Sequence, residues 1–168
     1  PVPTSIRDTD KLLPRKEQQR RAAVGTAAAW RLRMDKAQQC ANPRLTWHDH
    51  LTGTHRITPE IFGDAVIARG DIGVSYHLAV VVDDALDQIS LVTRGVDLAP
   101  STHLHRLLQA LLGLPAPDYL HHKLVCDTAG KRLAKRDDAD SIAQLRDNGL
   151  DHNKLLATLP VLPQLTLL

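Results

Sequence analysis

Three apolar segments between residues 89 and 126 constrain the fold of this 168-residue chain most strongly. The first, Ile89 to Thr93, is short and rich in β-branched residues, which is typical of a strand. The second begins at Pro100 and places its leucines on one face of a helix that ends at Gly113. The third, Leu120 to Cys126, again has the pattern of a strand. A strand, a helix and a strand in this order predict a parallel α/β layer.

Further elements are expected on either side of this layer. The apolar residues from Tyr76 to Leu86 recur at the spacing of an amphipathic helix, and Ala65 to Ala68 predicts a buried strand. Ser141 is expected to cap a short helix that ends near Gly149, and a last helix is expected around His152 to Leu159.

The first third of the chain has a different pattern. A polar helix is expected from Pro14 to Val24. The alternation of apolar and charged residues from Trp30 to Met34 predicts a half-exposed strand. Leu45 to Trp47 and His55 to Ile57 flank a turn-rich stretch, which predicts a hairpin. This third is therefore expected to form a small antiparallel unit.

Composition excludes several classes of protein. With 43% hydrophobic and 24% charged residues, the chain is expected to be globular, without a membrane partner. Cys40 and Cys126 are isolated, so neither a disulfide framework nor a cysteine-rich zinc site is expected, and a reducing cytoplasm is the predicted compartment. Aromatic residues make up only 3%, which argues against a stacking platform for single-stranded nucleic acid. The net charge of +2 permits an anionic partner without requiring one.

Cationic residues follow two of the expected strands. Ligands of open parallel sheets bind beyond the carboxyl ends of the strands, and Arg94 and Asp97 follow the first strand there. The second strand leads into the basic loop 131–136 (KRLAKR). A guanidinium suits a carboxylate and a basic loop suits a polyphosphate. On these residues alone, a surface salt bridge at Arg94 and a solvated basic loop are the commoner alternatives.

Paired acidic and histidine residues are weaker candidates. Asp83 and Asp84 point about 100° apart on a helix, so one is expected to face a site and the other solvent. Two histidine pairs, His103 with His105 and His121 with His122, also diverge in direction. Structural or solvent-facing histidines are therefore expected, and no metal site is predicted.

Four short motifs follow one another within residues 64–149. Residues 75–86 read SYHLAVVVDDAL, and residues 94–102 read RGVDLAPST. Residues 107–115 read LLQALLGLP, and residues 132–136 read RLAKR. In this order they resemble the YHLA-VVDD segment, the RG-DL--ST segment, the following helix and turn, and the KMSKS-type signature of class I aminoacyl-tRNA synthetases of the glutamyl type. One such motif would be weak, whereas four in the right order are specific.

The resemblance implies an α/β fold. The expected architecture is the second half of a Rossmann-type class I synthetase nucleotide-binding fold, preceded by part of a small α+β insertion. Residues 1–63 would then be part of the insertion (connective, acceptor-end) region. Residues 64–149 would form the second half of the catalytic α/β domain with its KMSKS-type loop, and residues 150–168 a C-terminal helix and tail.

The resemblance also implies a reaction, in which ATP with Mg²⁺ activates glutamate and the product is transferred to tRNA. Tyr76 and Arg94 would bind glutamate, Arg94 through one of the two carboxylates. Asp97, Leu98 and Leu133 would bind ATP.

The KMSKS-type signature would supply the catalytic cations. Lys135 and Arg136, with Arg132, would stabilise the triphosphate as pyrophosphate leaves, and Lys135 would also bind ATP. The sequence departs from the family at three positions: Arg132 replaces the first lysine, Ala134 replaces the serine, and Val80 replaces a common asparagine. Arg132 keeps the charge but not the compact ammonium group, and Ala134 loses a hydroxyl hydrogen bond.

The two ends of the sequence bear on the completeness of the fold and on which tRNA would accept glutamate. No HIGH-type motif is present, and the zinc-ligand cysteines of the family have no match, so zinc is not expected. Only residues 137–168 follow the signature, an ending that resembles the family branch that lacks an anticodon-binding region and glutamylates the queuosine of tRNA(Asp). The expected partners are glutamate, ATP and tRNA(Asp). The alternatives are a truncated enzyme charging tRNA(Glu) and a catalytically silent tRNA-binding remnant.

Overall fold

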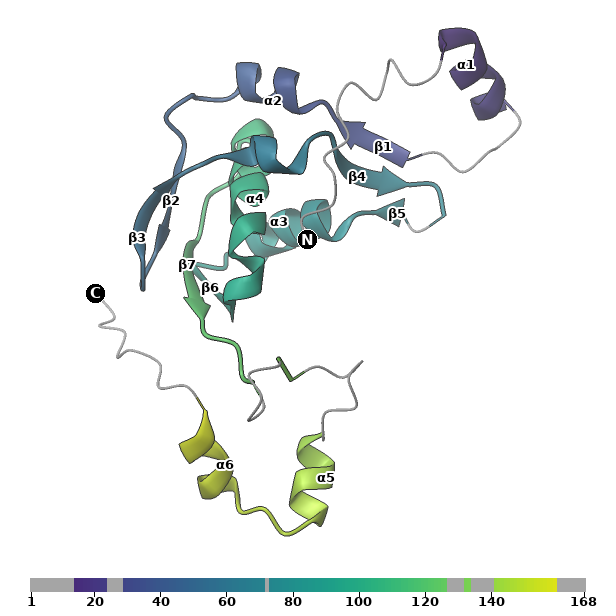
Figure 1. The fold of residues 1–168 in the computed structure, drawn as a ribbon. Coiled ribbons are helices and arrows are strands. Elements are labelled where there is room, and N and C mark those ends of the chain that lie inside the picture. Colours follow the sequence, from purple (N-terminus) through teal and green to yellow (C-terminus); the bar gives the residue numbers. More distant parts are fainter. Residues whose placement is uncertain (1–13, 24–28, 72, 127–131, 134–140, 160–168) are drawn as a thin grey trace.

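The structure is a computed structural model that describes residues 14–23, 29–71, 73–126, 132–133 and 141–159 (Figure 1). Its described strands form one sheet of four strands and one of three. The four-stranded sheet has the order β3 (Gly53–Arg56), β2 (Thr46–Asp49), β7 (Asp118–His122) and β6 (Leu91–Gly95). The three-stranded sheet has the order β1 (Ala29–Leu32), β4 (Ala65–Arg69) and β5 (Gly73–Val74).

The predicted strand, helix and strand form the centre of the molecule. Strands β6 and β7 are parallel, and α4 (Ala99–Leu112) connects them. The leucine face of α4 is buried, and Gly113 ends the helix with a left-handed φ of 67°. The predicted helix α3 (Tyr76–Leu86) begins at Ser75, whose side chain accepts a hydrogen bond from the main-chain N–H of Leu78.

Both strands differ from their expected positions: β6 lies two residues later than 89–93, whereas β7 begins two residues and ends four residues earlier than 120–126. The turn after α3 occupies residues 87–90, with Gln88 at a positive φ of 55° and the N–H of Ile89 bonded to the carbonyl of Asp84. Strand β6 therefore begins later and includes Arg94 and Gly95, which were expected to follow it. The pairing of β6 with β7 runs from Leu91 with Asp118 to Gly95 with His122.

The hairpin predicted in the first third is confirmed, but it does not stand apart. Strands β2 and β3 are antiparallel, and β2 also lies parallel to β7 through the pair Asp49 and Tyr119. The expected small antiparallel unit is therefore continuous with the parallel strands. The division expected at residue 63 remains a prediction.

The strand expected from Trp30 to Met34 is shorter than predicted. It ends at Leu32, and Met34 begins a helix that sequence reasoning missed, α2 (Met34–Cys40). The carboxylate of Asp64 accepts a hydrogen bond from the N–H of Met34, and the Met34 side chain is buried. The alternation of residues 30–34 predicted a strand up to Met34. The contact with Asp64, just before β4, instead starts a helix at Met34, which a local pattern cannot show.

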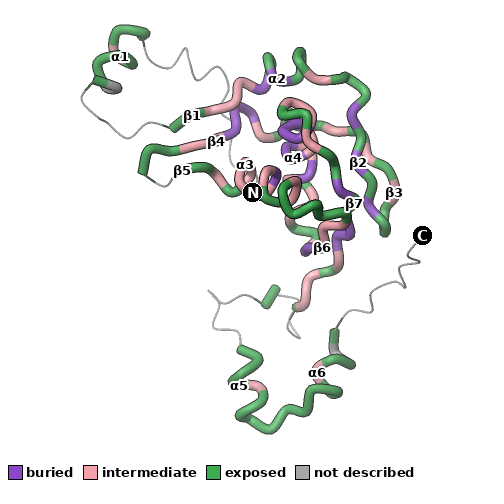
Figure 2. Tube along the Cα trace, turned by 180° about the vertical axis from the view of Figure 1, so that it is seen from behind, coloured by how far each residue is buried: buried purple, intermediate pink, exposed green. Residues whose placement is uncertain are grey.

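The hydrophobic core joins both parts of the chain. Helices α3 and α4 lie between the two sheets (Figure 1), and buried residues gather around them (Figure 2). The buried cluster draws on α2, β4, α3 and α4, and consists of Met34, Ala37, Ala65, Val81, Leu104, Leu107 and Leu108.

The remaining described elements are three helices and two short 3₁₀ turns. They are α1 (Arg15–Ala23), the 3₁₀ turns η2 (Pro59–Phe62) and η3 (Val96–Leu98), α5 (Ile142–Asp147) and α6 (His152–Thr158). Ser141 and Gln144 form a capping box at α5, which confirms the predicted helix start. Figure 2 shows α5 and α6 largely exposed, away from both sheets. None of the described helices is long and apolar enough to cross a membrane.

Candidate functional site

Arg94 lies at the end of β6 and is nearly buried, with 9% of its surface exposed. Three side chains accept hydrogen bonds from its guanidinium group. Its Nε donates to Nε2 of His121 at 3.1 Å, its Nη2 to Oγ1 of Thr102 at 2.6 Å, and its Nη1 to Nδ1 of His105 at 3.3 Å. The ring of Tyr119 lies against it, with its centroid 5.4 Å from Cζ. The orientation of the guanidinium plane is therefore fixed from three directions.

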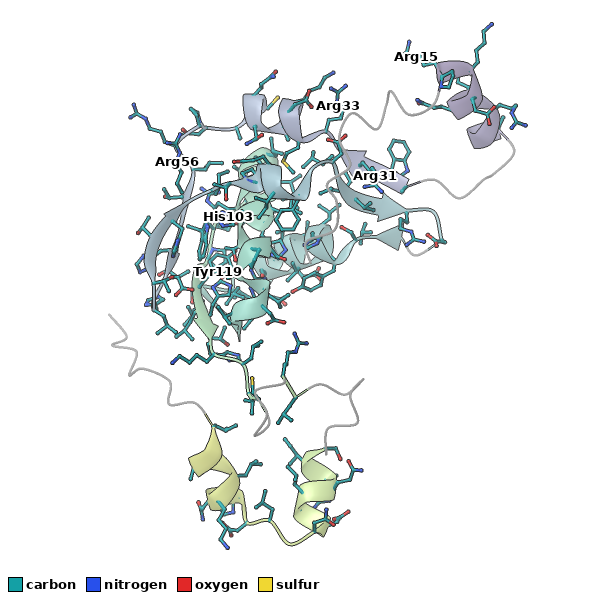
Figure 3. The ribbon with its side chains drawn as sticks, in the orientation of Figure 1. Arg15, Arg31, Arg33, Arg56, His103 and Tyr119 are labelled. Atoms are coloured by element: carbon teal, nitrogen blue, oxygen red, sulfur yellow. The ribbon has the colours of Figure 1, made fainter. Side chains whose placement is uncertain are left out.

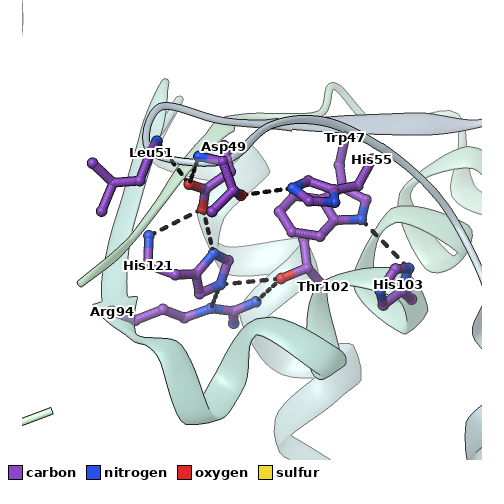
Figure 4. Close-up of polar contacts among 9 residues, drawn as sticks. Trp47, Asp49, Leu51, His55, Arg94, Thr102, His103 and His121 are labelled. Carbon is purple, nitrogen blue, oxygen red and sulfur yellow. Dashed lines mark hydrogen bonds and ion pairs between the residues drawn. The ribbon is translucent and has the colours of Figure 1, made fainter. Parts of the chain in front are cut away.

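The proton positions on His121 follow from this arrangement. An arginine Nε–H can only donate, so Nε2 of His121 must be the unprotonated nitrogen. The proton is then on Nδ1, which donates to Oδ2 of Asp49 at 2.6 Å (Figure 4). Asp49 also accepts hydrogen bonds from the main-chain N–H groups of His121, Leu51 and Thr52. Arg94, His121 and Asp49 thus form one directional chain of hydrogen bonds.

The charges of this chain are defined by its surroundings. Burial alone would raise the pKa of Asp49, but the hydrogen bonds from His121, Leu51 and Thr52 lower it below its ordinary value. Burial lowers the pKa of His121, although its bond to Asp49 opposes the shift. Asp49 is therefore a carboxylate and His121 a neutral imidazole.

A second branch runs from Arg94 toward α3. Because Nδ1 of His105 accepts from Arg94, its Nε2 carries the proton and donates to Nδ1 of His77 at 3.0 Å. Burial, the Arg94 charge and His77 lower the pKa of His105 to about 3. The ring centroids of Tyr76 and His105 lie 6.0 Å apart, and Tyr76 as a whole residue is 55% exposed. The structure thus brings the two residues expected to bind glutamate, Tyr76 and Arg94, to the same histidine.

The charge of Arg94 has no direct carboxylate partner within the described part of the chain. Two of its five N–H groups likewise have no acceptor among the described residues. A buried cation is costly unless an anion compensates it, and a guanidinium can bind both oxygens of one carboxylate. The site is therefore suited to a ligand that brings its own carboxylate.

The described residues among those expected to bind ATP lie on the segments that follow β6 and β7. Asp97, on η3, forms an ion pair with Arg132, which belongs to the loop after β7. Leu98 is half-buried beside Asp97, whereas Leu133 is 47% exposed. The N–H of Leu133 bonds to the carbonyl of Val125 at 2.9 Å, so the loop returns toward its strand. Two expected catalytic residues, Lys135 and Arg136, lie outside the described residues.

The acidic pair on α3 behaves as its geometry predicted. Asp83 is exposed and Asp84 is half-buried. Burial raises the pKa of Asp84, while the nearby Arg94 opposes the shift. One carboxylate thus faces the interior and the other solvent.

The histidine pairs diverge, as expected. The ring of His103 accepts a hydrogen bond from Nε1 of Trp47 at 3.4 Å, whereas His105 reaches Arg94. Figure 3 shows His103 and Tyr119 inside the molecule, whereas Arg15 and Arg33 lie at its outer edge. Across the residues with described positions, no three His, Cys, Asp or Glu side chains form a group that could hold a metal.

Sequence reasoning missed Asp49 and His121 as parts of this site. They lie 72 residues apart, and nothing in the pattern of β2 relates it to β7. The signal that could have found Asp49 is its position at the end of a predicted strand, the same signal that selected Arg94.

Parallel strands joined by a helix, with an arginine at the end of β6, form the arrangement expected for the catalytic domain of a class I aminoacyl-tRNA synthetase. Residues 3–162 match the family described as tRNA synthetases class I (E and Q), catalytic domain, and the chain belongs to this family. The resemblance and the fold class inferred from the sequence are thereby confirmed.

The relatives are more specific about the branch of the family. The chain is 50% identical over 125 residues to a protein named glutamyl-Q tRNA(Asp) synthetase from Rhodobacter capsulatus, covering 72% of this chain and 45% of the relative. It is 42% identical over 139 residues to the protein of the same name from Nocardia farcinica, covering 83% and 42%. The chain therefore spans less than half the length of these relatives.

Solved structures agree on the fold. A glutamate tRNA ligase from Elizabethkingia meningosepticum, in complex with its amino acid, superposes with a TM-score of 0.57 at 30% identity. The match covers 74% of this chain and 24% of that one. A glutamate-tRNA synthetase from Elizabethkingia anophelis gives a TM-score of 0.58, also at 30% identity, with the same coverage.

Proposed function

We propose that the complete protein containing this segment activates glutamate with ATP and transfers it to the queuosine of tRNA(Asp). The observation that carries the proposal is Arg94, a buried guanidinium held by three neutral acceptors and left without a direct carboxylate among the described residues. The family to which the chain belongs, and the relatives named glutamyl-Q tRNA(Asp) synthetase, support the same reaction.

In the proposed reaction, Arg94 binds one carboxylate of glutamate, and Tyr76 borders the same space. The α-carboxylate oxygen attacks the α-phosphorus of ATP, the bond from that phosphorus to the bridging oxygen breaks, and pyrophosphate leaves. Asp97, Leu98 and Leu133 lie on the nucleotide side. Catalysis of this kind depends mainly on positioning and on charge neutralisation, and Mg²⁺ accompanies ATP as part of the substrate.

The signature loop supplies the remaining charge. Lys135 and Arg136, with Arg132, are proposed to stabilise the triphosphate as pyrophosphate departs. The ion pair between Arg132 and Asp97 supports this role, because Asp97 is one of the residues proposed to bind ATP. An acceptor group of the tRNA then attacks the carbonyl carbon of the adenylate and loses its proton, the bond from that carbon to the phosphate oxygen breaks, and AMP leaves.

The acceptor has a second candidate. The chain is also 30% identical over 146 residues to a protein named glutamate–tRNA ligase 2 from Syntrophus aciditrophicus. That likeness favours tRNA(Glu), whereas the higher identities to the glutamyl-Q relatives favour tRNA(Asp).

Two assays on the complete protein test the proposal. Exchange of labelled pyrophosphate into ATP should depend on glutamate and should not be supported by glutamine or aspartate. Transfer of labelled glutamate should occur to tRNA(Asp) carrying queuosine, and not to the same tRNA carrying guanine. Transfer to tRNA(Glu) instead would establish the second candidate, and the absence of any exchange would identify a catalytically silent protein.

A further inference from the structure

We infer that Asp49 and His121 are positioning residues that hold Arg94 in the orientation needed to bind the carboxylate of glutamate. The inference rests on the proposed function and deepens it. It assigns a role in substrate binding to the hairpin β2–β3, which carries none of the residues expected to touch substrate.

The first step is the fixed geometry of the Arg94 guanidinium. Its Nε, Nη1 and Nη2 each donate to a different side chain, so rotation of the planar group would break several bonds at once. The three acceptors are themselves buried, with exposed fractions of 6% for His121, 0% for Thr102 and 2% for His105. Water therefore cannot easily replace any one of them.

The second step is the dependence of His121 on Asp49. Nε2 of His121 accepts from Arg94 only in the tautomer that carries its proton on Nδ1. The carboxylate of Asp49, 2.6 Å from Nδ1, stabilises this tautomer. In the other tautomer, an N–H of His121 would face the N–H of Arg94. Asp49 thus controls whether His121 can hold the arginine.

The third step is the position of Asp49 in the fold. It is the only residue of β2 that pairs in register with β7 among the described strand pairs, opposite Tyr119. One of its oxygens is held by the N–H groups of Leu51 and Thr52, and the other by His121 (Figure 4). The turn of the hairpin therefore orients the carboxylate that orients His121.

The substitution Asp49→Asn in the complete protein tests this dependence. Asparagine has one acceptor oxygen where the Asp49 carboxylate has two, so it cannot accept both from the N–H groups of Leu51 and Thr52 and from Nδ1 of His121. The variant should therefore favour the other His121 tautomer. The KM for glutamate in pyrophosphate exchange should rise about tenfold, the effect of losing one hydrogen bond to a charged group. The KM for ATP should stay unchanged, and long-range proton–nitrogen NMR correlations should show the proton of His121 on Nε2. Asp118→Asn, which removes an exposed carboxylate paired with His50 on the same sheet, is the matched control.

A pair of His121 variants separates positioning from stability. His121→Asn can keep the bond to Asp49 but puts no acceptor where Nε2 of His121 lies, whereas His121→Gln can accept from Arg94 at that position and loses the bond to Asp49. The KM for glutamate should rise about tenfold in His121→Asn and by less than about threefold in His121→Gln, whatever their melting temperatures. If KM instead follows the melting temperature across both variants, the residues are merely structural and the inference is overturned.

The substitution Arg94→Lys distinguishes a failure of the proposed function from a failure of the positioning role of Asp49 and His121. If this variant leaves the KM for glutamate unchanged, the proposed function fails at its central residue. If Arg94→Lys raises that KM while Asp49→Asn and His121→Asn do not, the proposed function stands and the positioning role is wrong. Should Asp49→Asn not fold, the two His121 variants decide the question.

Discussion

Arg132 and Asp97 form an ion pair between two segments that leave neighbouring parallel strands, and this contact connects the two halves of the candidate site. Asp97 follows Arg94 closely on the segment after β6, and Arg132 belongs to the loop after β7. The segment after β6, which begins next to Arg94, and the segment after β7, which carries Arg132, therefore leave the sheet at the same edge. That proximity is what a site for an amino acid and a nucleotide requires.

Replacing Asp97 should affect nucleotide binding more than stability. The ion pair is partly exposed, at 48% for Arg132 and 31% for Asp97, so its loss should change the free energy of unfolding by less than about 1 kcal/mol. We expect Asp97→Asn to raise the KM for ATP in pyrophosphate exchange while the KM for glutamate stays constant. Asp71→Asn, which removes an exposed ion pair with Arg69 on the other sheet, is the control. An equal effect of both variants would contradict the role of Asp97.

Gly95 is required by space rather than by backbone conformation. It has an ordinary φ of −65°, but a Cβ there would lie 2.5 Å from Oδ1 of Asp97 and 2.8 Å from Cδ2 of Leu124. Gly95→Ala should therefore displace the Asp97 side chain from Arg132, whereas the free energy of unfolding should change by less than about 1 kcal/mol, because the atoms in the way are the ends of movable side chains. Gly113→Ala is a useful comparison, because its surroundings are open and its cost comes from its positive φ. Only Gly95→Ala should raise the KM for ATP.

Arg94→Lys should impair both substrate binding and folding. A lysine keeps the charge but cannot donate to His121, Thr102 and His105 together, which leaves buried acceptors unpaired. We expect a loss of about 1–3 kcal/mol in the free energy of unfolding, measured by chemical denaturation, and a large rise in the KM for glutamate. Arg106→Lys, on α4, alters a half-exposed arginine that bonds to a main-chain carbonyl, and should leave that KM unchanged.

The parallel layer was predictable because its signals are local. The leucine face of α4, the stop at Gly113 and the apolar run of β6 each lie within a short window of sequence. The exact strand bounds were not predictable, because they depend on a turn closed by Gln88 at a positive φ. With β6 two residues later than expected, Arg94 lies within the strand and is buried, rather than just beyond the strand end.

The polar network could not be read from the sequence for a different reason. The position of Asp49 after a predicted strand makes it a candidate, but it does not identify its partner His121, which lies 72 residues away. Periodicity predicts which face of an element is apolar, but it does not predict which strands become neighbours. The single parallel pairing of β2 with β7 creates the contact, and only the structure shows it.

The buried histidines should make folding sensitive to mild acid. The folded pKa of His105 is about 3, below the ordinary value of about 6.5 that it has in the unfolded chain. Between these values the unfolded chain binds a proton that the folded protein does not, so stability falls as the pH is lowered. The expected slope is about 1.4 kcal/mol per pH unit for His105 alone. His77, His103 and His121 act in the same direction, because burial lowers the pKa of each.

Comparing unfolding at pH 7 and pH 5 in the complete protein isolates this effect. The pKa of Asp49 is lowered below its ordinary value near 4, so its contribution is lost only at lower pH and does not enter this window. His105→Gln cannot titrate, so its stability should fall less between the two pH values than that of the wild type. His152→Gln, at an exposed position on α6, should fall as much as the wild type does. An unchanged pH dependence in His105→Gln would show that His105 is not held neutral in the folded protein, because a histidine that titrates normally contributes no slope to lose.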